Sequence, residues 1–199
     1  MERVLTTESA AIWRSVVGSL ANNVYVIQCR TSGASVVVDA AAEPAMLSKS
    51  LGRFSPDLIL TTHGHADHIG AVEHLRGEGM VFAMHAADQF LTTKPIDREL
   101  AEGSISCGDL AVQVLETPGH TPGSVCFFVE GVLLTGDTLF PGGPGATRFA
   151  YSDFDQVIDS ITRKLFVLDP VTPFLPGHGE PSTIGAEAPS LDEWIARRW

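Results

Sequence analysis

Short apolar runs recur along the chain between turn-forming residues, which is typical of strands, while spacings of three and four mark fewer helical segments. Strands are predicted over Val24–Cys29, Ser35–Ala40, Leu58–Thr61, Val81–Met84, Leu110–Glu116, Val125–Val129, Val132–Leu134 and Thr172–Leu175. Helices are predicted over Glu43–Leu51, over a segment with Ile69, Val72 and Leu75 on one face, over Asp153–Leu168, and over Ser190–Trp199. Two strand-rich halves with interleaved helices indicate an α/β fold, an αββα sandwich of two mixed sheets flanked by helices, in one domain over residues 1–199.

Local signals place several details of these elements. Pro44 fits the first turn of its helix, and Ser152 is expected to cap the long helix that follows it. In the C-terminal helix, Trp194 and Ile195 are expected to pack back onto the core. Phe90–Ser106 has no regular period, so a solvated loop is expected there, with the border of a substrate entrance as the alternative.

The densest polar cluster follows the strand predicted at Leu58. Residues 61–70 have the sequence TTHGHADHIG, with three histidines and one aspartate within six positions. In an extended turn, residues two apart point the same way, so His63 and His65 should converge. Asp67 and His68 open the next element and should face a second point. Imidazole and carboxylate suit Zn²⁺, Fe and Mn²⁺, so this short segment predicts ligands for two metal positions.

Three later segments share one design, an apolar strand that ends at a ligand-type residue beside glycine. They are TPGHTPGS around His120, LLTGDTLF around Asp137 and FLPGHG around His178. Glycine beside each ligand permits the tight turn that aims it. A surface cluster of histidines that arose by accident would not be matched by three such segments, so a metal site is the favoured interpretation.

Three other polar residues have simpler interpretations. His74 lies on a predicted helix outside the motif and is interpreted as a surface histidine. His85 follows a predicted strand and has the same interpretation. Asp39 ends a predicted strand, and we interpret it as a turn or capping residue outside the metal set.

Together, these segments resemble the metallo-β-lactamase superfamily, whose pattern is an HxHxDH turn followed by a later His, Asp and His. The resemblance extends from about Asn22 to Ile184. TPGHTPGS, GDTLF and LPGHG are most similar to short glyoxalase II-like (hydroxyacylglutathione hydrolase-like) hydrolases. An αββα sandwich is also the fold that the resemblance implies, and an acidic residue is common in the family at the position of Asp39.

The resemblance implies a ligand set residue by residue. The first metal would be bound by His63, His65 and His120, the second by Asp67, His68 and His178, and both by a bridging Asp137. Two divalent ions per chain are expected, zinc first, with iron or manganese as alternatives. A hydroxide that bridges the ions would attack a carbonyl carbon. Asp67 and Asp137 are therefore the expected catalytic residues, and no Ser or Cys nucleophile is needed.

Composition and charge restrict the classes of binding partner and the cellular compartment that we expect for this protein. The chain has 24 Asp and Glu against 13 Lys and Arg, a formal net charge of -11, so a nucleic-acid partner is not expected. No run approaches the roughly 20 apolar residues of a membrane span, and Met1–Leu20 lacks the apolar core of a secretory signal. Cys29, Cys107 and Cys126 are an odd number without close pairing, which is typical of free thiols. A cytoplasmic protein is therefore expected, and the oligomeric state is left open.

A small-molecule thioester or ester is the expected substrate. Two divalent ions would make the pocket of this acidic protein locally positive, so an anionic acyl group, such as a 2-hydroxyacyl thioester, would be tolerated. Full-length glyoxalase II enzymes carry a C-terminal helical domain that helps to bind glutathione, and this chain is expected to lack it. Such relatives often have Lys or Arg at the position of Ala146, and nearby Arg148 is the candidate anion contact. The acyl group and the thiol carrier are left open.

Other classes of function compete with a hydrolase. Mononuclear iron persulfide dioxygenases are similar at the first site, which includes the counterpart of Asp137, and leave the second site empty. They commonly have Arg and Asp at the positions of Ala146 and Arg148, which favours the hydrolase. A non-enzymatic metal-binding domain would not need all seven ligands. β-Lactamases are exported and several have Cys in place of Asp137, and flavodiiron-type reductases need a flavin domain, so neither is expected.

Overall fold

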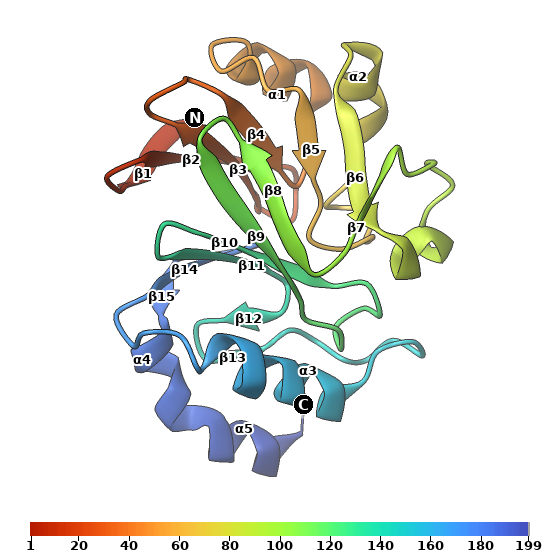
Figure 1. The fold of residues 1–199 in the computed structure, drawn as a ribbon. Coiled ribbons are helices and arrows are strands. Elements are labelled where there is room, and N and C mark those ends of the chain that lie inside the picture. Colours follow the sequence, from red (N-terminus) through yellow and green to blue (C-terminus); the bar gives the residue numbers. More distant parts are fainter. Residues whose placement is uncertain (199) are drawn as a thin grey trace.

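The computed structural model describes residues 1–198, and its strands form two large sheets that face each other (Figure 1). The first sheet has seven strands in chain order: β1 (Glu2–Thr6), β2 (Ala10–Val17), β3 (Asn22–Cys29), β4 (Ser35–Val38), β5 (Leu58–Leu60), β6 (Val81–His85) and β7 (Arg98–Leu100). Neighbours from β1 to β4 are antiparallel, and neighbours from β4 to β7 are parallel. The sheet is therefore mixed, as predicted.

The second sheet has six strands in the order β15 (Ser182–Thr183), β14 (Pro173–Pro176), β11 (Val132–Gly136), β10 (Val125–Val129), β9 (Leu110–Glu116) and β8 (Gly103–Cys107). Strands β11 and β14 pair in parallel, and the other neighbouring pairs are antiparallel. A two-stranded ribbon of β12 (Leu139–Phe140) and β13 (Gly143–Pro144) follows β11. The predicted hairpin is confirmed as β10 and β11.

Helices cover the outer face of each sheet (Figure 1). Their bounds are α1 (Pro44–Leu51), α2 (Val72–Gly77), α3 (Phe154–Ser160), α4 (Ile184–Glu187) and α5 (Leu191–Arg197), with 3₁₀ turns η1 (Ala86–Leu91) and η3 (Ala188–Ser190) and a π-helical turn η2 (Ile161–Leu165). Helices α1 and α2 cover the first sheet, and α3 and α5 cover the second (Figure 1). The structure therefore confirms the αββα sandwich.

Three apolar clusters hold the layers together. The central cluster lies between the sheets and includes the fully buried Ile27 and Val112. A second cluster packs Leu47 of α1 and Leu75 of α2 onto the first sheet. The third packs α3 and η2 onto the second sheet. All four residues of β4, Ser35–Val38, are buried, because this strand lies in the middle of the first sheet, with the central cluster on one face and the second cluster on the other.

Several helix predictions need correction in detail. The predicted helix over residues 153–168 is an α-helix only to Ser160 and continues as η2. Asp153, and not Ser152, caps α3: its side chain accepts a hydrogen bond from the backbone N–H of Gln156 at 3.0 Å. Ser152 instead donates to the carbonyl oxygen of His120 at 2.7 Å. In the structure, Ser152 therefore contacts the loop that carries His120 and does not cap the helix.

Some strands of the structure were not predicted from the sequence. Strands β1 and β2 were not predicted in the first 20 residues, and in β2 the charged Arg14 interrupts the apolar run. Its guanidinium lies 3.0 Å from Glu2 on β1 and 3.5 Å from Glu180. These two carboxylates explain how a charged residue is accommodated in the strand. The expected loop over Phe90–Ser106 contains β7 and most of β8.

The C-terminal prediction is right for one side chain and wrong for the other. Trp194 of α5 is buried at 3% exposure, as predicted, whereas Ile195 is 43% exposed. Trp199, which the predicted helix included, lies outside the described residues. Among the described helices, none has the length and apolarity to cross a membrane. Cys29, Cys107 and Cys126 are buried free thiols.

Candidate metal centre

All seven candidate ligands lie at one edge of the sandwich, because each follows the carboxyl end of a strand. The turn after β5 carries His63, His65, Asp67 and His68. From the second sheet come three ligands: His120 between β9 and β10, Asp137 after β11, and His178 after β14. The first sheet therefore supplies four of the candidate ligands and the second sheet three.

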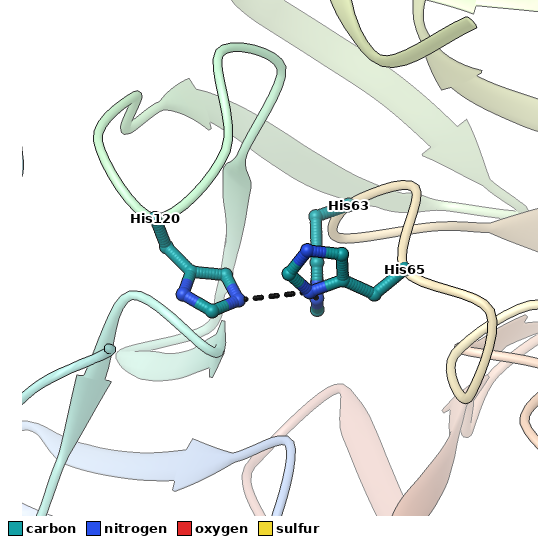
Figure 2. A group of neighbouring side chains, drawn as sticks. All are labelled: His63, His65 and His120. Carbon is teal, nitrogen blue, oxygen red and sulfur yellow. Dashed lines mark hydrogen bonds between the residues drawn. The ribbon is translucent and has the colours of Figure 1, made fainter. Parts of the chain in front are cut away.

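Three imidazole rings form the first group, and Figure 2 shows them converging from two separate loops. His65 Nδ1 lies 3.0 Å from His63 Nε2 and 3.0 Å from His120 Nε2. These three nitrogens are close enough to share one ion, and they are all within 4.8 Å of one another.

The second group joins Asp67, His68 and His178. His68 Nε2 lies 3.2 Å from His178 Nε2, and Asp67 Oδ2 lies 3.5 Å and 3.4 Å from these two nitrogens. Asn22, which the sequence analysis did not single out, donates its side-chain N–H to Asp67 Oδ2 at 2.8 Å and so orients this carboxylate.

Asp137 lies between the two groups. Its Oδ1 is 3.4 Å from His68 Nε2, and its Oδ2 is 3.8 Å from His120 Nε2 and 3.7 Å from His178 Nε2. Buried Asp137 Oδ1 has no hydrogen-bond partner. A Cβ added at Gly177 would overlap this oxygen, so the glycine before His178 is required for the close approach. An unpartnered carboxylate oxygen between two imidazole groups fits a cation.

Each of the five imidazoles has an outer partner for its second ring nitrogen. These partners are Thr62 Oγ1 for His63 at 3.1 Å, Tyr151 OH for His65 at 2.8 Å, Asp39 Oδ2 for His68 at 2.9 Å, the Ala146 carbonyl for His120 at 2.7 Å and the Leu20 carbonyl for His178 at 2.9 Å. Carboxylate and carbonyl oxygens only accept, so the outer nitrogens of the last three rings donate. In the neutral form of these rings, the inner nitrogens present lone pairs to the ligand group to which each ring belongs, which is the arrangement that metal binding needs.

Asp39 serves both groups and is more than the turn residue that the sequence suggested. It is 2% exposed, and its Oδ2 accepts from His68 Nδ1–H at 2.9 Å and from the Thr62 hydroxyl at 2.8 Å. Oδ1 accepts from the Thr62 backbone N–H at 2.8 Å. Because Thr62 in turn faces His63, one carboxylate orients a ring of each group. Asp39 follows β4, which pairs in parallel with β5, and this neighbourhood is the signal that could have identified it.

Burial and charge shift the pKa values of the two groups in opposite directions. Desolvation lowers the pKa of His63 and of His120, and lowers the pKa of His65 to about 4. Desolvation also acts on His68, but Asp137 and Asp39 outweigh it and raise its pKa to about 9. In the metal-free protein, the first group is therefore neutral at pH 7, and His68 is an imidazolium among carboxylates.

The second group shows the same pairing of charges. The hydrogen bond to Asp67 raises the pKa of His178. Burial acts to raise the pKa of Asp67, but the hydrogen bond from His178 and the charge of His68 outweigh it and lower that pKa well below its usual range.

The centre opens into a cavity of about 510 Å³. Leu20, Phe140 and Phe149 form its apolar walls, and Arg148 lies at its rim with its Cζ 5.6 Å from the centroid of the Phe149 ring. Within residues 1–198, Arg148 has no ion pair or hydrogen bond. The predicted anion contact thus lies in the cavity that contains the metal ligands, with its guanidinium free to bind.

The two remaining histidines lie outside the centre. His74 is exposed on α2, with its Nε2 3.5 Å from Glu78 Oε1. His85 Nδ1 accepts a hydrogen bond from the backbone N–H of Ala87 at 3.2 Å. Neither side chain lines the cavity. His74 is a surface histidine, as predicted, whereas His85 is only partly exposed, with its Nε2 3.4 Å from Glu116 Oε1.

Comparisons with known proteins place this site in context. An uncharacterized protein of Mycobacterium tuberculosis is 36% identical, over 85% of this chain and 91% of its own. The hydroxyacylglutathione hydrolase of Rhodospirillum rubrum is 36% identical over 79% of this chain, but the match spans only 62% of that enzyme.

Solved structures agree with the fold. BLEG-1 B3 metallo-β-lactamase has a TM-score of 0.83 at 31% identity, with 89% of this chain and 96% of that chain covered. TTHA1623 in a di-iron-bound form gives 0.80 at 31% identity, over 88% and 96%. ETHE1 from Myxococcus xanthus gives 0.78 at 26% identity, over 88% and 80%. The family model of the metallo-β-lactamase superfamily matches residues 17–178, which contain all seven candidate ligands. The chain therefore belongs to the metallo-β-lactamase superfamily.

Proposed function

We propose that this protein is a metal-dependent hydrolase of a small thioester, similar to glyoxalase II, with two divalent ions per chain. The observation that carries the proposal is that two ligand groups with Asp137 between them lie beside one open cavity, which is lined by His65 and His120 of the first group, by Asp67 and His178 of the second, and by Asp137. The proposed ligands are His63, His65 and His120 for one ion, Asp67, His68 and His178 for the other, and Asp137 for both. Zinc is the proposed metal, because imidazole and carboxylate ligands suit it, although the relative TTHA1623 binds two irons.

The ions would supply a nucleophile from water at neutral pH and would polarise the carbonyl group. The protein's own residues orient the ligands: Asp39 and Thr62 fix His68 and His63, and Asn22 fixes Asp67. The described residues that line the cavity include no Ser or Cys. Hydrolysis by an attacking water, with Asp67 and Asp137 as the catalytic carboxylates, therefore fits the site better than covalent catalysis by a side chain.

The cavity walls suggest the chemistry of the substrate. Leu20, Phe140 and Phe149 suit an apolar acyl or thiol portion, and unpaired Arg148 suits a carboxylate or another anionic group. A 2-hydroxyacyl thioester with an anionic thiol carrier has both features. The named R. rubrum relative supports this class, while its additional length leaves glutathione itself open.

Composition supports the remaining features of the proposal. Three buried free thiols suit the reducing cytoplasm. The formal net charge of -11 disfavours a nucleic-acid partner. We propose a cytoplasmic enzyme formed by one domain.

Metal content and a substrate panel test the proposal together. Protein purified without added metal is analysed for metals, and then assayed with 2-hydroxyacyl thioesters, a chromogenic β-lactam, and persulfide with oxygen uptake. About two metals per chain with thioester hydrolysis is the expected result. About one iron per chain with persulfide-dependent oxygen uptake would favour a dioxygenase instead, and turnover of the β-lactam alone would favour a lactamase.

Arg148→Ala tests the substrate anion. For a thioester with a carboxylate, the variant should raise KM about tenfold, because one charge-assisted contact is lost. For an otherwise matched thioester without a carboxylate, KM should not change. Arg163→Ala is the control, because exposed Arg163 pairs with Asp159 and does not line the cavity. Equal effects of Arg148→Ala on both thioesters would contradict an anion contact.

A further inference from the structure

Asp88 is a buried carboxylate that the sequence analysis did not single out. It lies in η1, directly after β6, and is 0% exposed. Its Oδ2 accepts hydrogen bonds from the Gly64 backbone N–H and the Thr121 hydroxyl, each at 2.7 Å. Its Oδ1 accepts from the Gly123 backbone N–H at 2.7 Å. All three distances lie within the range of hydrogen bonds to a charged acceptor.

The donors belong to two loops from different sheets. Gly64 separates His63 from His65 in the turn after β5 of the first sheet. Thr121 directly follows His120, and Gly123 lies in the same loop between β9 and β10 of the second sheet. One carboxylate therefore joins the two loops that carry all three histidines of the first group.

Glycine at both loop positions is a condition for this contact. A Cβ at Gly64 would lie 3.0 Å from the Cβ and the carbonyl oxygen of Asp88. A Cβ at Gly123 would lie 2.8 Å from the Asp88 Cγ. The small spacers between ligands thus let Asp88 lie directly against both loops, in addition to allowing tight turns.

The charge of Asp88 has no cationic partner. Within residues 1–198, no Lys, Arg or His lies at ion-pair distance from it. An isolated buried carboxylate is costly, and its three short hydrogen bonds offset that cost. A carboxylate also accepts from donors on both of its oxygens, which an amide of the same shape does not do. The geometry therefore favours a role that needs both loops at a fixed separation.

We propose that Asp88 is a positioning residue for the first metal, one that holds the His63–His65 turn and the His120 loop at the separation that the ion requires. The proposal rests on the two-metal centre proposed above. The second group should not depend on Asp88, because none of its donors is adjacent in sequence to Asp67, His68 or His178.

Asp88→Asn tests this role in two backgrounds that each retain one ligand group. His178→Ala disables the second group, and His120→Ala disables the first. Zinc dissociation constants are measured by competition with a chromophoric chelator, and folding is followed by circular dichroism. In the His178→Ala background, Asp88→Asn should weaken zinc binding about 10–100-fold, which is typical of an outer partner. In the His120→Ala background, zinc binding should not change.

A matched control separates positioning from general loss of stability. Asp97→Asn also removes a carboxylate that accepts from a backbone N–H, that of Phe82, and Asp97 pairs with Arg76, so neither of these partners is a candidate ligand or lies in a ligand loop. It should leave both zinc constants unchanged. If Asp88→Asn does not fold, Thr121→Val removes a single donor to Asp88 and should weaken the first group alone, by a smaller factor.

The outcomes are distinct. An unchanged zinc constant of the first group, or equal weakening of both groups, would overturn the role of Asp88. Absence of zinc binding by the unsubstituted chain would instead overturn the metal centre itself.

Discussion

Replacing Asp39 by asparagine should perturb both ligand groups, because the two oxygens of this buried carboxylate bind Thr62 and His68. The carboxylate accepts three hydrogen bonds, two from Thr62 and one from His68 Nδ1, at 2.8–2.9 Å. Asparagine keeps the shape but presents an N–H₂ group where one oxygen stood. At least one of the three donors then faces another donor, and the charge beside His68 is lost.

The size of the effect follows from these contacts. A hydrogen bond to a charged group contributes about 1.5–3 kcal/mol, and an unpaired buried donor costs a similar amount. Asp39→Asn should therefore lower the stability of the folded protein by about 1.5–3 kcal/mol. For a chain of this length that corresponds to about 3–12 °C in Tm. Zinc affinity should fall about 10–100-fold at both positions, since both His63 and His68 lose their orientation.

The assay combines thermal unfolding with zinc competition, in the same two single-group backgrounds used for Asp88. Asp97→Asn again supplies the control for loss of a carboxylate elsewhere. The comparison with Asp88 is the most informative part of the assay, because Asp39 binds His68 directly and reaches His63 through Thr62, whereas Asp88 binds only the two loops that carry the first group. If Asp39→Asn weakens just one group, or lowers Tm without any change in zinc affinity, the reasoning about a shared orienting carboxylate is wrong.

Three further predictions follow from the site. Asp137→Ala removes the ligand common to both groups, so kcat/KM should fall by about 1000-fold or more, and metal analysis should show fewer than two ions per chain; retained turnover would contradict the two-metal centre. His74→Ala should leave activity and metal content unchanged, because His74 is exposed on α2, and a severe loss in a thioesterase assay would contradict this position. The pKa of His68, raised to about 9 in the metal-free protein, means that the second ion displaces a proton below pH 9. Its affinity should therefore rise by at least about tenfold per pH unit below pH 9, since the pKa of His178 in the same group is raised as well, whereas binding to the first group, whose histidines have lowered pKa values, should be flat above about pH 6.5. Calorimetry in two buffers of different ionisation heat measures the proton release, and its absence at pH 7 would contradict the raised pKa.

The seven candidate ligands could be predicted from the sequence because all of them lie in short turns after apolar strands, and five of them stand directly beside glycine. Such signals are local, since a strand period, a turn residue and a ligand type lie within a few positions. The hairpin of β10 and β11 was predicted for the same reason, as Glu130-Gly131 separates two apolar runs. Boundaries were less well placed where two local signals compete, as at Ser152 and Asp153.

Residues whose roles depend on contacts between distant segments were missed. Asp39 is 23 positions before Thr62, and Asp88 is 33 positions before Thr121, so neither pairing leaves a periodic signal. Strand β2 was also missed, and Arg14 interrupts its apolar run. The carboxylates of Glu2 and Glu180, which pair with this guanidinium, come from two other segments of the chain. In each case, a polar residue in an unexpected place is explained by a partner that only the folded chain supplies.

The division of the ligands between the two sheets has a consequence for the interior of the protein. Because neither sheet holds a complete group around Asp137, the spacing of the ligand atoms depends on how the sheets pack against each other. That packing is set by side chains such as Ile27 and Val112, which are not candidate ligands and are fully buried in the central cluster. Metal coordination tolerates only about 0.2 Å of error in distance, and a single added methylene group in a packed core displaces its neighbours. We therefore expect that a substitution in the middle layer changes the metal affinity of the candidate centre even though it leaves all seven candidate ligands in place.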